Sequence, residues 1–305
     1  MGHTTRQLGT LALAWCAIVG LCFTLLRLTP GDPAEIFAAA ANIGGAAVVA
    51  ELRAQWGLDR PAVEQFWLWL TAFLQGDWGH SFVTGRPVAA EFAARLPWSL
   101  AIGIGGLALA AFSGFGLGFA AARRPGGLLD GLSRAVAVAG QALPAFAIGL
   151  LLLWYLSAEL RLVRPLFGGP IERLALPLLL VAFFSIGGLA RITAAAFADV
   201  ERAPFLLTAR AKGLGRSAAL WRHGRRHAAL ALVAALTPEA AWVIGGTAIA
   251  EIVFATPGLS EFVLRAVTNR DFAVLQAYVA VIAVWLLAVR GLAEVAHRHI
   301  DPRPR

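Results

Sequence analysis

Charged residues are scarce in this 305-residue chain: they make up 14% of it, whereas hydrophobic residues make up 59%. Soluble domains carry roughly 25% charged and 45 to 50% apolar residues, so the composition excludes an ordinary soluble protein and indicates a bilayer. Cysteine is nearly absent, since Cys16 and Cys22 are the only two. Six residues apart on one helix, they would be separated by about 9 Å along the axis, so they cannot pair with each other.

The chain also lacks the short motifs of common enzymes. It has no G-x-S-x-G, no H-E-x-x-H and no phosphate-binding G-x-x-x-x-G-K-[ST]. His223 and His227 have the spacing of a two-histidine metal site, but the flanking residues Arg225 and Arg226 would repel a cation and no acidic residue or cysteine is near. We therefore expect a non-catalytic protein with no cofactor and no metal site.

Six stretches are long and apolar enough to cross a membrane, which takes about 20 residues: 8–28, 98–122, 135–157, 174–193, 228–251 and 274–295. The first is longer than the apolar region of a signal peptide, and no A-x-A-like cleavage site follows it, so we expect it to be retained. The sequence predicts an all-α fold, a polytopic membrane bundle of six transmembrane helices.

The basic residues lie mainly in the segments 123–134 and 202–226 and in the tail, which includes Arg298, Arg303 and Arg305. Because lysine and arginine in short loops favour the cytoplasmic side, we expect both termini inside. The same distribution explains the net charge of +8. Nucleic acid is not an expected partner, because the basic residues lie beside spans and are not interleaved with aromatic ones that could stack on bases.

The segment 29–97 is too long and too apolar for a plain linker, and it predicts short helices on the outer face. Within it Val63, Phe66, Trp67 and Leu70 recur at helical spacing. Its tryptophans are either interfacial rings at headgroup depth or the core of a small external cap: Trp56, Trp67, Trp69 and Trp78. We therefore divide the chain into residues 1–97, a first span with this cap, and residues 98–305, a five-helix core.

Several residues within the predicted spans are candidates for the translocation path. Pro144 and Pro238 interrupt helical hydrogen bonding and are candidate kinks. Glu239 follows in an apolar span, where a charge indicates a cavity or a partner helix. Glu251 lies near the outer end of the same span, where we favour a capping or interfacial residue. The glycine-rich second span should pack inside the bundle.

The segment of about 199–227 is basic and lies between two spans. Taken as a helix, its first part carries one apolar stripe, formed by Val200, Pro204, Leu207, Ala211 and Leu214. Gly213 and Gly215 should end that helix, and Ser217 can cap a second one. The pattern predicts either a docking element for a partner or a solvated basic loop held near anionic lipid.

Residues Leu207 to Leu214 read L-T-A-R-A-K-G-L, and this segment resembles the R-T-A-R-A-K-G-L loop of permease subunits of ATP-binding-cassette importers for dipeptides, oligopeptides and nickel. The resemblance continues in order along the chain, with Pro30-Gly31-Asp32-Pro33, Gly57-Leu58-Asp59-Arg60-Pro61, Gly76-Asp77 with Gly79 and Ser81, Arg86-Pro87-Val88, Leu96-Pro97, Leu143-Pro144 with Phe146 and Gly149, Glu251 with Val253-Phe254, Pro257-Gly258-Leu259, Arg270-Asp271 and Asp301-Pro302-Arg303.

The resemblance implies a pore-forming subunit in a bacterial inner membrane. Its implied partners are a second homologous permease in a heterodimer, two ATPase subunits, an extracytoplasmic binding protein and membrane lipid. It also implies a coupling helix in the cytoplasm, which would transmit the closure of the ATPase through Thr208, Ala209, Arg210, Ala211, Lys212, Gly213 and Leu214.

The chain departs from the family pattern at several places. Leu207 replaces the usual arginine, Ala203-Pro204 replaces an acidic pair, Ala231 stands where a proline is typical, and Pro238-Glu239 is unusual for its span. The first three affect the polar contacts to an ATPase but not the helix-turn-helix shape.

Peptides are the first candidate substrates, with nickel chelates, opines or other small polar solutes behind them. The alternative is a secondary transporter or channel, which leaves the basic loop unexplained and often shows inverted repeats, which we do not find.

Overall fold

The computed structural model describes residues 2–28, 31–40, 43, 45–165 and 168–301. These residues are helical almost throughout, and they contain no strand, only an isolated bridge between His80 and Pro87. The all-α fold class is confirmed. Pro30, Pro302 and Arg303 of the family-like motifs, and Arg305 of the basic tail, lie outside the described residues.

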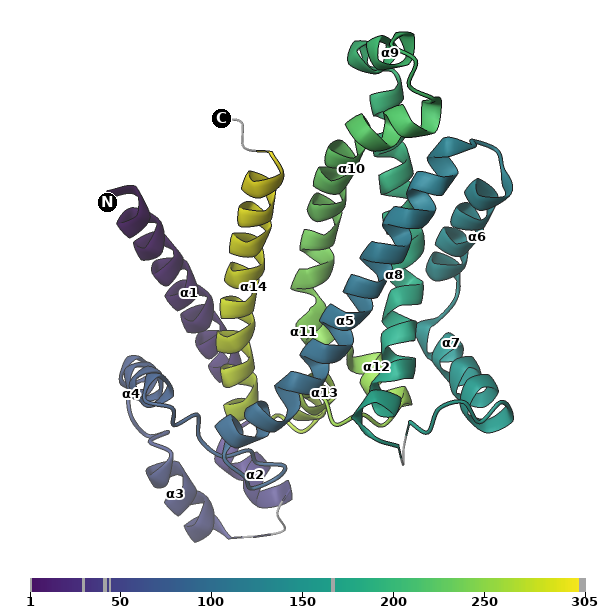
Figure 1. Cartoon of the computed structure of the whole chain (residues 1–305). Helices are drawn as coiled ribbons and strands as arrows, with labels where there is room; N and C mark the ends of the chain where they lie inside the picture. Colours follow the sequence, from purple (N-terminus) through teal and green to yellow (C-terminus); the bar gives the residue numbers. More distant parts are fainter. Residues whose placement is uncertain (1, 29–30, 41–42, 44, 166–167, 302–305) are drawn as a thin grey trace. The chain divides into compact units, whose positions relative to one another are not determined.

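The chain divides into two units, each described here by itself: Met1–Leu96 with Phe262–Leu287, and Pro97–Glu261 with Ala288–Arg305. Unit 1 contains α1 (Gly2–Leu28), α2 (Pro33–Ala40), α3 (Ala46–Gln55) and α4 (Ala62–Leu74). Unit 2 contains α6 (Leu128–Ala142), α7 (Ala145–Leu152), the π-helical η1 (Leu153–Glu159), α8 (Pro170–Glu201), α9 (Pro204–Ala211), α10 (Arg216–Ala241), α11 (Val243–Gly246) and α12 (Ala248–Val253). Three helices have residues in both units: α5 (Val88–Arg123), α13 (Leu259–Thr268) and α14 (Phe272–Ile300) (Figure 1).

Four of the described helices are long and apolar enough to span a membrane, and α6 with α7 and η1 makes a fifth if the bent pair counts as one span. The four correspond to the predicted spans 8–28, 98–122, 174–193 and 274–295. The count of six is not confirmed, because the predicted spans 135–157 and 228–251 are both broken.

The break in the predicted third span comes at Pro144. The chain bends by 110° between the helices on either side, and Leu143 is extended with φ −95° and ψ 137°. A residue before proline is driven out of the helical region by the proline ring, which explains the bend. The kink predicted at Pro144, within the span 135–157, is therefore confirmed.

The predicted fifth span breaks at a different place from the one expected. Helix α10 continues through Pro238 to Ala241, and the irregular backbone comes later, at Ile244 and Gly245. Gly245 has φ +111°, a conformation that glycine adopts without steric cost. Pro238 therefore does not end the helix, and the kink that the structure shows in this span lies at Ile244 and Gly245.

Glycines of α5 allow the close approach of α8 in unit 2. A Cβ at Gly118 would lie 2.5 Å from the carbonyl oxygen of Ala190, and one at Gly114 would lie 3.2 Å from that of Ile186. Small residues let helices pack closely in lipid, where apolar side chains gain nothing from leaving the solvent. One face of the glycine-rich span thus packs closely on α8.

Unit 1 is built on aromatic contacts. Trp56 stacks on Phe82 with ring centroids 4.7 Å apart, and Trp78 stacks on Phe73 at 4.8 Å. Trp69 also stacks on Phe73, whereas Trp67 is 58% exposed. All four tryptophans singled out in the sequence therefore make ring contacts within this unit, Trp67 with Phe66 at 5.7 Å. Trp67 alone of the four is exposed, as an interfacial ring would be.

Candidate functional site

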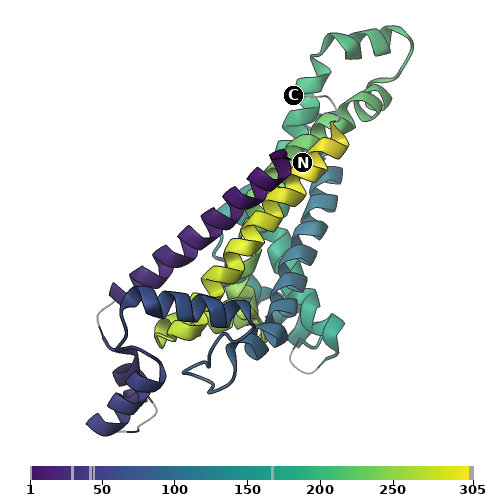
Figure 2. The same cartoon turned by 90° about the vertical axis from the view of Figure 1, so that its left-hand side faces the viewer.

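The basic segment after α8 forms a short helix, α9, at the far end of the α8 and α10 pair, and both views show it there (Figures 1 and 2). Pro204 is its first residue, a position where the missing N–H of proline costs nothing. Ala203 before it is extended, with φ −74° and ψ 139°, so α8 cannot continue into α9. The continuous stripe predicted from Val200 to Leu214 on one helix is therefore wrong.

Helix α9 ends in a glycine-dependent turn. Gly213 has φ +91°, its N–H donates to the carbonyl of Arg210 at 2.9 Å, and the N–H of Leu214 donates to that of Ala209 at 3.3 Å. This pair of bonds, with the apolar contact of Leu214 in the same cluster as Ala209, is the Schellman helix end. The prediction that Gly213 ends this helix is confirmed.

Two residues of α9 face inward. Leu206 and Ala209 are buried against Val200 of α8 and against Ala219 and Leu220 of α10. The opposite face is exposed and carries Leu207, Thr208, Arg210, Ala211 and Lys212. Leu207 is 59% exposed. This residue, one of those that depart from the family pattern, therefore lies on the surface available to a partner.

Arg216 holds the base of this element in place. Its guanidinium donates to both carboxylate oxygens of Glu201, at 2.5 and 2.9 Å, and to the carbonyl of Arg123 at the end of α5, at 2.6 Å. Bidentate arginine–carboxylate pairs are among the stronger polar contacts in proteins. The predicted cap of α10 by Ser217 is wrong, because Gly215 occupies the cap position. The Ser217 hydroxyl instead accepts a hydrogen bond from Arg123 Nε at 2.9 Å.

A cavity of about 270 Å³ lies within unit 2. Its wall is mostly apolar and includes Leu107, Val181, Phe184 and Trp242, while Glu239 is one of its few polar residues, with Ser185 and Thr247. Pro144 and Pro238 each directly precede a lining residue, Ala145 and Glu239 respectively.

Glu251 occupies a different environment. It is fully buried, one carboxylate oxygen accepts bonds from the hydroxyls of Ser99 and Thr247, both at 2.6 Å, and the other accepts the N–H of Glu261 at 2.8 Å. The full burial of Glu251 excludes the interfacial interpretation, whereas the bond from the N–H of Glu261, in the first turn of α13, agrees with the capping interpretation. A carboxylate so deeply buried needs several donors, and they come from α5, α13 and the segment before α12.

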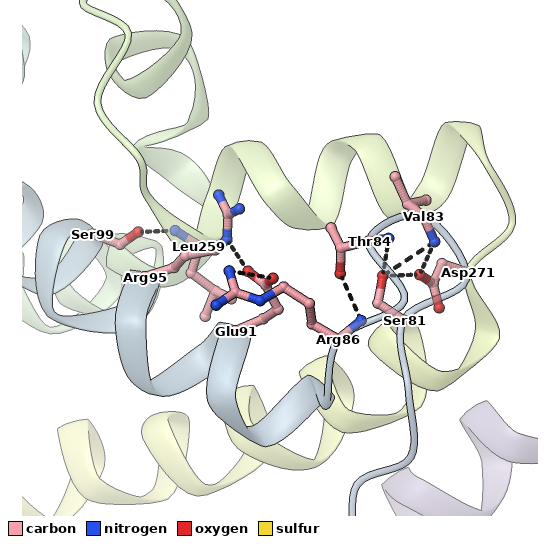
Figure 3. A network of polar contacts seen from close by, with 9 residues as sticks. All are labelled: Ser81, Val83, Thr84, Arg86, Glu91, Arg95, Ser99, Leu259 and Asp271. Atoms are coloured by element: carbon pink, nitrogen blue, oxygen red, sulfur yellow. Dashed lines mark hydrogen bonds and ion pairs between the residues drawn. The ribbon is translucent and has the colours of Figure 1, made fainter.

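The donors around Glu251 continue into a wider polar network. Ser99 Oγ accepts the N–H of Leu259 at 2.8 Å (Figure 3). Ser260 Oγ lies 2.9 Å from Thr247 Oγ1 and accepts the N–H of Gly245 at 2.9 Å, so it satisfies a backbone group freed by the break. Sequence reasoning missed Ser99, Thr247 and Ser260. The available signal was hydroxyl residues in or beside apolar spans, which alone does not indicate which residues meet.

Unit 1 has a corresponding buried carboxylate, Asp271. Its side chain accepts the Ser81 hydroxyl at 2.6 Å and the N–H of Val83 at 3.3 Å (Figure 3). Burial raises the pKa of the Asp271 carboxyl above its usual value, although these hydrogen bonds oppose the shift. In the same unit Glu91 lies between Arg95, at 2.7 Å, and Arg86, at 3.5 Å (Figure 3). Two motifs that are distant in sequence, Ser81 and Arg270-Asp271, thus meet.

Comparison with known proteins identifies the family. A family described as "Binding-protein-dependent transport system inner membrane component" matches residues 114–305. The chain is 34% identical over 300 residues to the glutathione transport system permease protein GsiC of Pectobacterium atrosepticum, covering 98% of this chain and 97% of the relative. The chain belongs to this family. The same protein of Salmonella paratyphi A is 34% identical over 305 residues, covering 100% and 99%, and that of Escherichia coli K12 is 33% identical over 300 residues, covering 98% and 97%.

The protein is thus the permease subunit of an ATP-binding-cassette importer, a non-catalytic multi-pass protein of a bacterial inner membrane. Such a permease works with ATPase subunits and with a binding protein.

Proposed function

We propose that this permease forms the translocation path for peptides or related small solutes, with both termini in the cytoplasm. The GsiC relatives are named for the transport of glutathione, which is itself a small peptide, and this supports the substrate class. An extracytoplasmic binding protein delivers the solute, and a second, homologous permease completes the path as a heterodimer. ATP is hydrolysed by two partner ATPase subunits.

The observation that carries the proposal is the construction of α9. The helix begins at Pro204 and ends in the turn at Gly213, is anchored by Leu206 and Ala209, and is tied at its base by the pair between Arg216 and Glu201. A short helix that is fixed to two long ones transmits a displacement of its tip as a rigid body. We propose that its exposed face docks in a cleft of the ATPase, where Leu207 and Ala211 supply apolar contacts and Arg210 and Lys212 supply charge.

The proposed path includes the cavity beside Glu239. A charge at membrane depth is costly, and in this cavity the carboxylate is available to a polar or cationic part of a solute. Pro144 contributes by turning α6 into α7 beside the cavity. Glu251 contributes indirectly, because its hydrogen bonds fix the broken backbone between α10 and α13.

The test of coupling is Gly213→Val in the complete transporter, reconstituted in liposomes. A β-branched residue at φ +91° should cost about 1–3 kcal/mol, which tilts or unwinds the end of α9, so ATP-driven uptake should fall while membrane insertion remains normal. The matched control is Gly215→Val, because Gly215 has φ −60° and ψ 149°, which valine adopts readily, and its added side chain meets open space.

Three outcomes would contradict this function. The first is uptake that continues unchanged when the ATPase subunits lack their catalytic carboxylate. The second is a cysteine cross-link series over residues 208–217 that never captures an ATPase subunit. The third is a set of topology reporters that place this segment outside the cell.

A further inference from the structure

Unit 1 contains a second cavity, of about 700 Å³, within the size range of small-molecule sites. It lies among the end of α1, helices α2 to α4, the segment 77–85 and the start of α14. Its wall includes the aromatic side chains of Phe23, Phe37, Trp56, Trp69, Trp78 and Phe82. Nothing in the proposed coupling or translocation uses this cavity.

Three residues that line this cavity have buried polar atoms with no hydrogen-bond partner among the described residues: Arg27 Nε, Gln65 Oε1 and Trp69 Nε1. The side-chain amide nitrogen of Gln65 donates to the carbonyls of Leu58, at 3.0 Å, and Arg60, at 2.7 Å. The amide oxygen of Gln65 accepts no hydrogen bond from the described residues. Buried polar atoms are rarely left unsatisfied. Two donors and one acceptor around the same cavity therefore indicate a bound group with the complementary atoms.

Two of these side chains, Arg27 and Trp69, are neighbours around Phe23. The guanidinium carbon of Arg27 is 5.2 Å from the centroid of the Phe23 ring, and the Trp69 ring is 6.4 Å from it. Gln65 is four residues from Trp69 on α4 and shares its helix face. The three polar atoms thus belong to side chains on adjoining parts of one cavity wall.

The charges around the cavity favour an anion at Arg27. The carboxylate of Asp77 also lines the cavity, but it forms no ion pair with Arg27 in the part of the chain that the structure describes, and one of its oxygens accepts the N–H of Gly79 at 3.0 Å. The carboxylate of Asp32, which is near Arg27, is already paired with Arg53. The guanidinium of Arg27 is therefore available to bind an anionic group of a ligand.

We propose that this cavity binds a phospholipid whose phosphodiester is followed by a hydrogen-bond donor, as in phosphatidylglycerol or phosphatidylethanolamine. Arg27 and Trp69 donate to phosphate oxygens, and the oxygen of Gln65 accepts from the hydroxyl or ammonium of the headgroup. The source is the bilayer itself, because Arg27 lies in the last turn of α1, a candidate span of which only 11% is buried within the protein. Tryptophan-rich walls are typical of headgroup depth.

Native mass spectrometry of the full-length permease tests this proposal, after exchange of its lipids for phosphatidylglycerol, phosphatidylethanolamine or phosphatidylcholine. We expect one tightly held lipid with either of the first two headgroups and none with phosphatidylcholine, which lacks the donor. The arm that retains more lipid identifies which of the two is the natural ligand.

Arg27→Gln should weaken retention by about tenfold or more, as expected for loss of a charge-assisted hydrogen bond. The matched control is Arg60→Gln, since Arg60 is an exposed arginine of the same unit, paired with Glu64. Trp69→Phe keeps an aromatic ring and removes the N–H, so it should also reduce lipid retention. This variant provides the test if Arg27→Gln fails to fold. Equal retention of phosphatidylcholine, retention unchanged in both variants, a bound peptide in place of lipid, or no bound lipid at all would overturn the proposal.

Discussion

Glu239 and Glu251 lie in the same predicted span, yet the structure gives them opposite environments. Glu251 is fully buried and its two oxygens accept three hydrogen bonds. Glu239 is half-buried and faces a mostly apolar cavity. A charge in an apolar segment is therefore not by itself a sign of function. The carboxylate whose burial is explained by its partners is structural, and the one that faces a cavity is the candidate for solute contact.

The position of Glu251 is defined from several sides. Its donors come from α5, from Thr247 and from the start of α13, and a Cβ added at Gly258 would lie 2.1 Å from its carboxyl carbon. In lipid a broken helix needs internal partners for its freed backbone groups. Glu251 and its neighbours supply them, so this network is a condition for the break at Gly245.

The largest expected effect follows from removing the structural carboxylate. Glu251→Ala would leave the hydroxyls of Ser99 and Thr247 and the N–H of Glu261 without this acceptor, at a cost on the order of 3 kcal/mol, because each stranded buried donor costs about 1–3 kcal/mol. We expect a lower melting temperature of the purified permease in detergent, and a loss of assembled transporter.

The control for this variant is Glu159→Ala, which changes an exposed carboxylate of the same unit and should leave the melting temperature unchanged. Gly258→Ala tests the same network without removing charge, since its methyl group must displace the Glu251 carboxylate. If Glu251→Ala and Gly258→Ala both melt like the unmodified permease, the network does not have the structural role assigned to it.

The second prediction concerns the carboxylate at the cavity. Glu239→Gln keeps the size of the side chain and removes its charge, so the melting temperature should stay the same while uptake falls about tenfold, as expected for loss of a charge-assisted contact of about 1.5–3 kcal/mol. Uptake into liposomes and thermal unfolding, measured on the same preparation, separate the two effects.

The deciding comparison is between the two carboxylates. If Glu239→Gln lowers stability as much as Glu251→Ala does, or leaves uptake unchanged, the assignment of a solute-facing role to Glu239 fails. Solutes with and without an amino group sharpen the result, because a carboxylate that contacts an ammonium group should distinguish between them.

The sequence predicted what local chemistry determines. The end of α9 at Gly213 and the bend at Pro144 follow from single residues whose backbone preferences are strong. The helical class and four of the spans follow from apolar length.

What the sequence could not predict depends on residues distant from each other. Ser99 and Glu251 meet only because α5 and α12 pack in one unit, and nothing in either segment encodes that meeting. The break at Gly245 instead of Pro238 has the same origin, since Ser260 must be in place to satisfy the N–H of Gly245. The sequence predicted the wrong buried face for α9, because it assumed one continuous helix from Val200 to Leu214. The chain breaks before Pro204, so Leu206 and Ala209 face inward instead of Leu207 and Ala211.

Asp271 in unit 1 extends the comparison to a third carboxylate, with the smallest expected effect. Burial raises the pKa of its carboxyl, so the folded state favours the protonated form. The contribution of this group to stability is therefore fully present below the ordinary carboxyl pKa, and it is lost as the pH rises through the raised value. Asp271→Asn is neutral at every pH, so it should flatten this part of the profile.

The measurement is thermal unfolding of the permease and of Asp271→Asn in detergent from about pH 4 to about pH 8. At low pH the variant should be less stable by about 1 kcal/mol, because an amide matches the donors of Ser81 and Val83 less well than a carboxyl group does. As the pH rises, the stability of the variant should increase relative to that of the unmodified permease. Asp59→Asn, at an exposed position of the same unit, should run parallel to the unmodified permease. A constant difference for Asp271→Asn would mean that the hydrogen bonds from Ser81 and Val83 fully offset the desolvation of the carboxylate, which would make Asp271 equivalent to Glu251 as a satisfied structural charge.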